Sequence, residues 1–162
     1  MMRQDEKKPV HRMYFPTPAG ILCGEDDGEA LTALYVAEKG TDCSNLEGSL
    51  LLRKTEQELE EYFEGKRKEF DLPLHLHGTE FQKKVWEALR KIPYGETCSY
   101  LDIARMVGNP KACRAVGGAN HRNPVMILVP CHRVIGADGS LTGYGGGLGV
   151  KQYLLELEKK YI

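Results

Sequence analysis

Long apolar runs are missing from this sequence. No segment approaches the roughly 18 consecutive apolar residues of a membrane-spanning helix, although 41% of the 162 residues are hydrophobic, which is enough for a core. The first eight residues, Met-Met-Arg-Gln-Asp-Glu-Lys-Lys, are too polar for a signal peptide. We therefore expect a globular protein without membrane contact, located in the cytoplasm, or in the nucleus if the source is a eukaryote.

Paired cysteines are missing as well. The five cysteines are an odd number and contain no C-x-x-C spacing, which argues against a disulfide framework and a four-thiolate zinc site and is typical of a reducing compartment. A zinc site that combines Cys23 or Cys43 with His75 or His77 stays an alternative, but no pair has the tight spacing of zinc ligands. We expect no bound metal.

Nucleotide-binding motifs are also absent. The glycines of residues 142–149 match neither G-x-G-x-x-G nor a P-loop, so no nucleotide cofactor is expected. Their backbone N–H groups could instead approach a flat ligand, with Tyr144 stacking on it or closing over it.

Acidic residues are missing from one window of 35 residues. Positions 103–137 contain five Lys or Arg and no Asp or Glu, whereas the rest of the chain carries 17 basic and 23 acidic residues, a net charge of −6. A cationic face on an acidic body is typical of a nucleic-acid-binding protein. A merely solvated basic surface is the alternative, and a window this long disfavours it.

The first half predicts a small support domain over residues 1–77. Short strands are expected at 13–15, 20–23 and 31–36, a helix at 45–63, and a final strand or extended linker at 70–76. No concentrated chemistry lies in this half. The predicted fold class is α/β of the α+β type, with this sheet-plus-helix domain first.

The second half, residues 78–162, predicts a mainly helical, winged-helix-like domain. Thr79 can cap a helix that contains Trp86, and Ser99 with Asp102 forms a capping box for a helix over 100–107. A break at 108–110 precedes a second helix at 111–119. Two short helices joined by a glycine-containing turn predict a helix-turn-helix.

The second helix of this pair offers small side chains where Asn, Gln or Arg would be needed to read base edges. Gly117 and Gly118 each cost a helix about 1 kcal/mol relative to Ala, but they allow close backbone approach. We therefore predict sequence-independent docking through phosphates and shape in the minor groove, with Arg114 as the inserted side chain. The alternative is a closely packed core helix with Arg114 on its surface.

The apolar run 125–129, stopped by Pro130, predicts a buried strand that delivers Cys131 at its tip. A lone cysteine is usually a buried hydrophobe. Here His132 and Arg133 follow directly and can hold a thiolate, which favours a reactive, partly exposed thiol. Glu158 lies at the edge of an apolar helix stripe and, if buried, needs a partner such as His132; an exposed glutamate is the alternative.

An ordered set of motifs gives the chain a resemblance to a known family. The motifs are residues 78–97, Ser99-Tyr100, Gly108-Asn-Pro-Lys-Ala, Arg114-Ala-Val-Gly-Gly-Ala, Asn123-Pro and Pro130-Cys-His-Arg-Val. This set resembles the O6-alkylguanine-DNA alkyltransferases from about Gly78 to Glu158. The first half resembles the variable N-terminal domain of that family only loosely.

The resemblance implies direct DNA repair. The expected activity is that of a methylated-DNA–protein-cysteine methyltransferase, which transfers the alkyl group of O6-alkylguanine, with O4-alkylthymine as a further candidate substrate, to its own Cys131 once and irreversibly. Base flipping out of duplex DNA is needed to bring the alkylated oxygen to the thiol. The expected partner is double-stranded DNA that contains the lesion, and the expected state is a monomer without cofactors.

The resemblance also assigns roles to individual residues. Cys131 accepts the alkyl group, His132 deprotonates it through a water, and Glu158 orients the imidazole, as in a hydrolase triad. Asn123 is the hinge between the recognition segment and the active-site segment. Tyr100 hydrogen-bonds the guanine ring and stabilises charge on the departing base.

Two further groups of contacts follow from the resemblance. Arg114 fills the gap left by the extruded base, and the remaining DNA contacts are Lys111, Ala115, Gly117, Gly118, Arg122 and Tyr100. Substrate is bound by Val134, Tyr144, Gly145 and Met126. Gly145 stands where some members have serine, so only its N–H remains, and Met126 stands where some relatives have proline beside the alkyl pocket.

Three other functions are considered. An alkyltransferase-like protein binds alkylated DNA without a cysteine, and the presence of Cys131 disfavours it. A Cys-His hydrolase of small molecules would fit the Cys-His-Glu set, and the acid-free window disfavours that. A helix-turn-helix transcription factor would need better base-reading side chains on its second helix.

Overall fold

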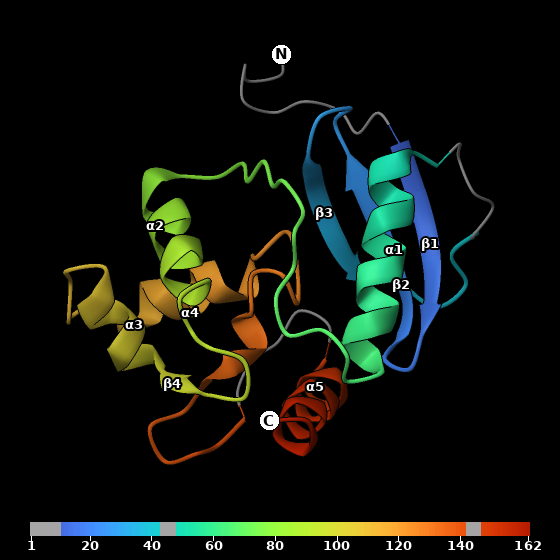
Figure 1. Cartoon of the computed structure of the whole chain (residues 1–162). Helices are drawn as coiled ribbons and strands as arrows, with labels where there is room; N and C mark the ends of the chain where they lie inside the picture. The colour runs from blue at the N-terminus through green and yellow to red at the C-terminus, as the bar shows by residue number, and fades with distance from the viewer. Residues whose placement is uncertain (1–10, 43–47, 142–146) are drawn as a thin grey trace. The chain divides into compact units, whose positions relative to one another are not determined.

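The computed structural model describes residues 11–42, 48–141 and 147–162. The chain divides into two compact units, residues 1–77 and 78–162 (Figure 1). Within the described ranges, no helix combines the length and the apolar character that crossing a membrane demands.

A three-stranded antiparallel sheet forms the first unit together with one helix. Strands β1 (His11–Thr17), β2 (Gly20–Asp26) and β3 (Leu31–Val36) pair in that order, and helix α1 (Leu50–Phe63) packs on β1 and β2, covering one face of the sheet (Figure 1). Phe15, Leu22, Leu34 and Leu59 are at most 1% exposed between the sheet and the helix. The predicted strands and mixed fold class are confirmed.

Helix α1 begins at Leu50 because Ser49 caps it, its hydroxyl accepting from the backbone N–H of Leu52 at 3.0 Å. The predicted start at Asn45 lies outside the described residues. Of the two alternatives predicted for residues 70–76, the structure has the extended linker. Its bridge between Leu74 and Leu31 is an isolated one and does not make a strand.

Two histidines hold the turn between β2 and β3. His11 Nδ1 lies 2.7 Å from Asp26 Oδ1, and His75 Nδ1 lies 2.7 Å from Asp27 Oδ2. Asp27 also accepts hydrogen bonds from the backbone of Glu29 and Ala30. These contacts link the start of β1 to the end of β2 and the extended segment 70–76 to the turn after β2.

The second unit is mainly helical, as predicted. Its elements in chain order are α2 (Glu80–Leu89), β4 (Cys98–Ser99), α3 (Tyr100–Met106), α4 (Cys113–His121), the 3-10 helix η1 (Cys131–Arg133), β5 (Val134–Ile135) and α5 (Leu148–Lys160). Strands β4 and β5 form a small parallel sheet. Helices α2, α3 and α4 pack against one another (Figure 1).

Capping explains where the helices of this unit begin. Thr79 with Gln82 forms a capping box at α2, and Ser99 with Asp102 forms one at α3. Trp86 is 2% exposed and donates its indole N–H to the carbonyl of Ala119 at 2.8 Å, which fixes α2 against α4. The predicted capping at Thr79 and at Ser99 is confirmed.

Helices α3 and α4 form the predicted helix-turn-helix. Gly108 has a positive φ of 81° in the connecting turn, a conformation that glycine adopts at little cost. Helix α4 begins at Cys113, two residues later than predicted, and ends at His121. Lys111 therefore precedes the helix.

The predicted strand over 125–129 is wrong. This segment is a tight turn in which Leu128 N donates to Met126 O and Val129 N donates to Val125 O, and Ile127 has a positive φ of 71°. Asn123 fastens the turn, because its side chain donates to Val129 O at 2.7 Å and accepts from Val125 N at 3.0 Å. Most apolar residues of this segment are thus buried in a turn, not in a regular strand.

Candidate active site and DNA-binding surface

Cys131 opens the 3-10 helix η1, directly after the turn at 125–129. Its backbone N–H donates to Val129 O at 2.8 Å, and its carbonyl accepts from Asn120 Nδ2 of α4 at 3.3 Å. Cys131 is not in a disulfide and is 5% exposed. The thiol is thus more buried than the sequence predicted, and its main chain is tied to the second helix of the helix-turn-helix.

His132 and Glu158 form a buried pair. His132 is 0% exposed and Glu158 on α5 is 1% exposed, and His132 Nε2 lies 2.6 Å from Glu158 Oε2. Because an ionised carboxylate only accepts, the ring proton lies on Nε2 and Nδ1 carries the lone pair. Nδ1 is buried and has no hydrogen-bond partner among the described residues, so this atom can take up a proton.

Arg133 is the second partner of Glu158. Its Nε and Nη2 donate to Oε1 and Oε2 of Glu158 at 2.8 and 3.0 Å, and its Nη1 donates to Ile92 O at 2.7 Å. The guanidinium carbon lies 5.7 Å from the ring centre of Tyr94. The expectation that Arg133 holds the thiolate is therefore wrong, because its charge is directed at the glutamate.

Glu158 accepts a fourth hydrogen bond, from the backbone N–H of Gly95 at 3.2 Å. Burial disfavours its charged form, but the hydrogen bonds from His132 and Arg133 outweigh burial and hold the pKa of Glu158 far below its usual range. Burial lowers the pKa of His132, the contact with Glu158 opposes this, and Arg133 and Lys151 add to the lowering. The site therefore pairs an anionic glutamate with a neutral histidine.

Lys151 is a buried cation next to this site. It is 0% exposed on α5, and its ammonium group donates to Val134 O at 2.6 Å. Burial lowers the pKa of Lys151, and the negative charge of the nearby Cys131 in its thiolate form opposes that shift. A positive charge close to Cys131 favours the thiolate over the thiol.

The structure brings some of the proposed substrate residues to the thiol segment. Val134 directly follows η1 and is 0% exposed, and Met126 is 6% exposed in the turn before Cys131. Tyr144 and Gly145 lie outside the described residues. The segment around Cys131 is thus flanked by apolar side chains.

The expected DNA contacts gather on and around α4. Arg114 and Ala115 are exposed on α4, and Lys111 and Arg122 are exposed just before and after it. No described residue provides a carboxylate for an ion pair with Arg114. Because Arg133 is buried, four of the five cations in the acid-free window face solvent. These four exposed cations are Arg105, Lys111, Arg114 and Arg122.

The glycines of α4 leave the helix surface open. A Cβ at Gly117 would meet only the ring of Tyr100 at 3.9 Å, and one at Gly118 would meet only Arg122 Nη1 at 3.5 Å. Tyr100, at the start of α3, therefore lies beside the exposed face of α4. This arrangement leaves room for a backbone or base to approach α4 closely.

Residues 23, 75 and 77 do not form a zinc site in the described part of the chain, where no group of three potential ligands occurs. His75 instead contacts Asp27. Cys43 lies outside the described residues.

Sequence reasoning missed the contacts of Asn120, Lys151 and Arg133. Asn120 could have been suspected because a polar residue at its position falls on the buried side of α4. Lys151 carried no such signal, since lysine is almost never fully buried. The contact between Arg133 and Glu158 joins residues 25 positions apart, which no local pattern indicates.

A helix-turn-helix and a buried Cys-His-Glu set in one unit, preceded by a small sheet-plus-helix unit, are the arrangement expected of a DNA-binding protein with a cysteine nucleophile. Two family models match the chain: the 6-O-methylguanine DNA methyltransferase ribonuclease-like domain over residues 13–76 and the DNA binding domain of the same proteins over residues 80–160. The chain belongs to the 6-O-methylguanine DNA methyltransferase family.

Curated relatives agree with this assignment. A methylated-DNA–protein-cysteine methyltransferase of Methanosarcina acetivorans is 49% identical over 153 residues, covering 92% of this chain and 98% of the relative. One of Mycobacterium leprae is 48% identical over 156 residues, covering 94% of each chain.

Solved structures give the same result. The crystal structure of the Mycobacterium tuberculosis O6-methylguanine methyltransferase is similar with a TM-score of 0.86, 47% identity and 94% coverage of each chain. A structure of Mycobacterium tuberculosis OGT in complex with DNA is similar with a TM-score of 0.87, 48% identity and 94% coverage of each chain.

Proposed function

We propose that this protein repairs O6-alkylguanine in double-stranded DNA by transferring the alkyl group to its own Cys131. The observation that carries the proposal is the buried pair of His132 and Glu158 directly beside Cys131, in the unit that also holds the helix-turn-helix. The names of the curated relatives and the DNA complex of the tuberculosis protein support it.

The proposed reaction begins with removal of the thiol proton. His132 Nδ1 takes the proton from Cys131 through a water, while Glu158 holds the ring by Nε2. The thiolate attacks the alkyl carbon, the carbon–O6 bond breaks, and its electrons remain on the guanine. Tyr100 hydrogen-bonds the guanine ring and stabilises its negative charge, and the base is neutralised by one proton, which balances the proton that His132 took from the thiol and returns to solvent. The thioether formed is stable, so each molecule reacts once.

The DNA contacts are proposed to divide between two tasks. Lys111, Arg122 and the backbone of Gly117 and Gly118 hold phosphates, which fixes position without reading sequence. Arg114 enters the duplex and takes the place of the extruded base. The remaining proposed contacts are Ala115 in the DNA surface and Val134, Met126, Tyr144 and Gly145 around the guanine, with Asn123 as the hinge.

In this proposal the first unit is a support domain, the second unit carries DNA binding and alkyl transfer, and the protein acts as a monomer. We place it in the cytoplasm because its nucleophilic thiol must stay reduced, and reducing compartments provide that condition. Double-stranded DNA with the lesion is the partner.

The decisive experiment is intact-protein mass after incubation with duplex DNA that contains one O6-methylguanine. We expect a gain of one methyl group per protein, mapped to Cys131, and no gain in Cys131→Ala with DNA affinity kept. Cys113→Ala is the matched control, because that thiol lies on α4 and is more exposed than Cys131. Transfer retained by Cys131→Ala, or lost in Cys113→Ala, would contradict the assignment.

A second experiment tests base extrusion. Arg114→Ala is expected to slow transfer from duplex DNA while transfer from the free O6-methylguanine base stays unchanged. Arg105→Ala removes the same charge from an exposed position of α3 and serves as the control. Equal slowing on duplex and free base would refute the role of Arg114.

A further inference from the structure

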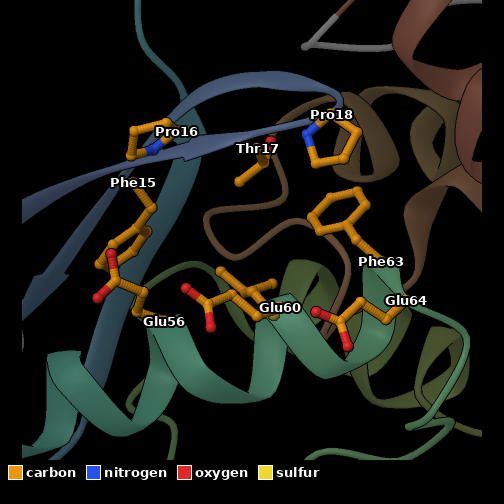
Figure 2. Close-up of a pocket in the computed structure, with 9 residues that line it drawn as sticks. Phe15, Pro16, Thr17, Pro18, Glu56, Glu60, Phe63 and Glu64 are labelled. Atoms are coloured by element: carbon orange, nitrogen blue, oxygen red, sulfur yellow. The ribbon is translucent and has the colours of Figure 1, made fainter.

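The first unit contains a cavity that the repair proposal does not use. It lies between the end of β1 and helix α1, and its volume is about 170 Å³ (Figure 2). Engineered apolar cavities of about 150 Å³ accommodate benzene. The cavity is therefore large enough for one side chain or a group of similar size.

The walls of the cavity are apolar and stiff. Phe15 and Leu59 are each 1% exposed and line its interior, together with Phe63, which is 8% exposed. Pro16 and Pro18 flank it on the side of β1, and Figure 2 shows Pro18 next to the ring of Phe63. Proline and phenylalanine have few rotatable bonds, so this shape is largely preformed.

Three carboxylates follow the rim of the cavity along α1. Glu56, Glu60 and Glu64 lie four residues apart, which places them on one side of the helix with a rise of about 6 Å between neighbours. Figure 2 shows Glu56 and Glu60 projecting from α1, and Glu64 at the C-cap of this helix, beside the apolar side chains. A group that enters the cavity therefore passes a row of negative charge.

One rim carboxylate, Glu64, pairs with Lys66 at 2.8 Å, and the other two differ from the carboxylates elsewhere on α1. Glu58 and Glu61 both pair with Arg67, at 3.6 and 2.9 Å. Within residues 11–42, 48–141 and 147–162, Glu56 and Glu60 have no cationic partner. Like charges four residues apart destabilise a helix. Glu56 and Glu60 are such a pair, and their repulsion is not offset by an ion pair with a described residue.

We propose that this cavity binds an arginine side chain presented by a basic polypeptide partner. The methylene stem would fill the apolar interior, and the planar guanidinium would stack on Phe63 and bond to Glu56 and Glu60. The first unit has 10 basic and 16 acidic residues, a net charge of −6. That charge attracts a cationic partner and repels nucleic acid, so this surface serves a protein and not DNA.

The test uses the full chain without DNA and the probe acetyl-Gly-Arg-Gly-amide, followed by NMR of the backbone amides. We expect saturable shifts at Phe15, Leu59 and Phe63, with a dissociation constant of about 1 mM for so small a probe. The matched probe replaces arginine with citrulline, which has nearly the same shape and no charge. We expect it to bind at least about fivefold more weakly, since each exposed ion pair contributes a factor of roughly 2 to 5.

Two double variants that remove the same amount of charge distinguish binding in the cavity from non-specific electrostatic attraction to the acidic unit. Glu56→Gln with Glu60→Gln is expected to weaken arginine binding about fivefold, whereas Glu29→Gln with Glu69→Gln, both exposed and outside the cavity, leaves it unchanged. Equal weakening by the two double variants would overturn the proposal. Equal affinity for the citrulline probe would show an apolar cavity without charge recognition and would also overturn it.

Stability of the free protein gives a second test. A purely structural role for Glu60 predicts that Glu60→Gln lowers the melting temperature, whereas a repulsive binding rim predicts a rise of about 2 °C. Self-association of the chain that competes with the probe would identify a second copy as the occupant and overturn the proposal. Neither measurement depends on alkyl transfer, so failure here leaves the repair function untouched.

Discussion

Replacing Arg133 with methionine tests how the buried charges are balanced. The change roughly keeps the volume of the side chain but removes two hydrogen bonds that Glu158 accepts, at 2.8 and 3.0 Å. It also removes the donor to Ile92 O. The hydrogen bonds of Glu158 with His132 and with the N–H of Gly95 are kept.

The expected cost is large because Glu158 is 1% exposed. Removing one partner of a buried ion pair destabilises a protein by about 3–5 kcal/mol, since the other charge stays buried without compensation. For a unit of 60–100 residues, 1 kcal/mol changes the melting temperature by about 4–8 °C. We therefore expect Arg133→Met to melt at least about 12 °C lower.

The same substitution should change the pH dependence of alkyl transfer. Burial lowers the pKa of His132 and the positive charge of Arg133 lowers it further, so removing Arg133 raises that pKa. The neutral imidazole is the base, and a higher pKa depletes it at a given pH. The acidic limb of the rate profile should therefore move to higher pH, measured as single-turnover methyl transfer at 10 °C or another temperature at which the variant is folded.

A double-mutant cycle with Glu158→Gln isolates the pair. In the Glu158→Gln background no carboxylate remains, so Arg133→Met should cost much less stability than in the natural chain. Arg105→Met, at an exposed position of α3, controls for loss of charge. An equal cost in both backgrounds, or an acidic limb that stays in place, would refute the reasoning.

Three further substitutions have defined expected outcomes. Asn123→Ala should lower the free energy of unfolding by about 2–3 kcal/mol in urea, because it removes two hydrogen bonds that fasten the turn before Cys131. Burial raises the pKa of Asp27, but the hydrogen bonds with His75 and with backbone N–H groups outweigh burial. The pKa of Asp27 therefore lies below its usual range. Its stabilisation is therefore present above about pH 4 and lost as pH falls, so Asp27→Asn should flatten the acid side of the stability profile. Gly118→Ala should stabilise the fold by up to about 1 kcal/mol and weaken DNA binding in a fluorescence anisotropy titration, because a methyl group blocks close approach.

Each of these has an outcome that would contradict it. An unchanged urea midpoint in Asn123→Ala would mean that the turn holds without its side chain. An acid slope in Asp27→Asn equal to that of the natural chain would show that another carboxylate is responsible. Tighter DNA binding by Gly118→Ala would mean that the α4 backbone does not approach DNA.

Local signals in the sequence predicted much of the secondary structure. Thr79 and Ser99 are capping residues with a matching third position, so the beginnings of α2 and α3 could be found without any tertiary information. Helix α1 was also recognisable from its apolar spacing. The start of α4 was less accurate because Ala112 at its N-cap makes no side-chain hydrogen bond.

The apolar run at 125–129 shows why other parts were predicted wrongly. A short apolar run is consistent with a buried strand, but periodicity cannot tell it from any other buried segment. What decides the conformation is the side chain of Asn123, which satisfies backbone groups that a sheet would otherwise pair. The adjacency of Cys131 and His132 is visible in the sequence. The burial of Lys151 and the ion pair between Arg133 and Glu158 depend on how α5 packs.

The 3-10 helix at Cys131–Arg133 makes the arrangement of its side chains sensitive to the length of this segment. A 3-10 helix has three residues per turn, so consecutive side chains leave its axis about 120° apart, and three neighbours can take three separate tasks. Insertion or deletion of a single residue would turn the side chains that follow it within this short helix by about a third of a turn. We therefore expect a one-residue change in length here to disturb the site more than a conservative substitution does.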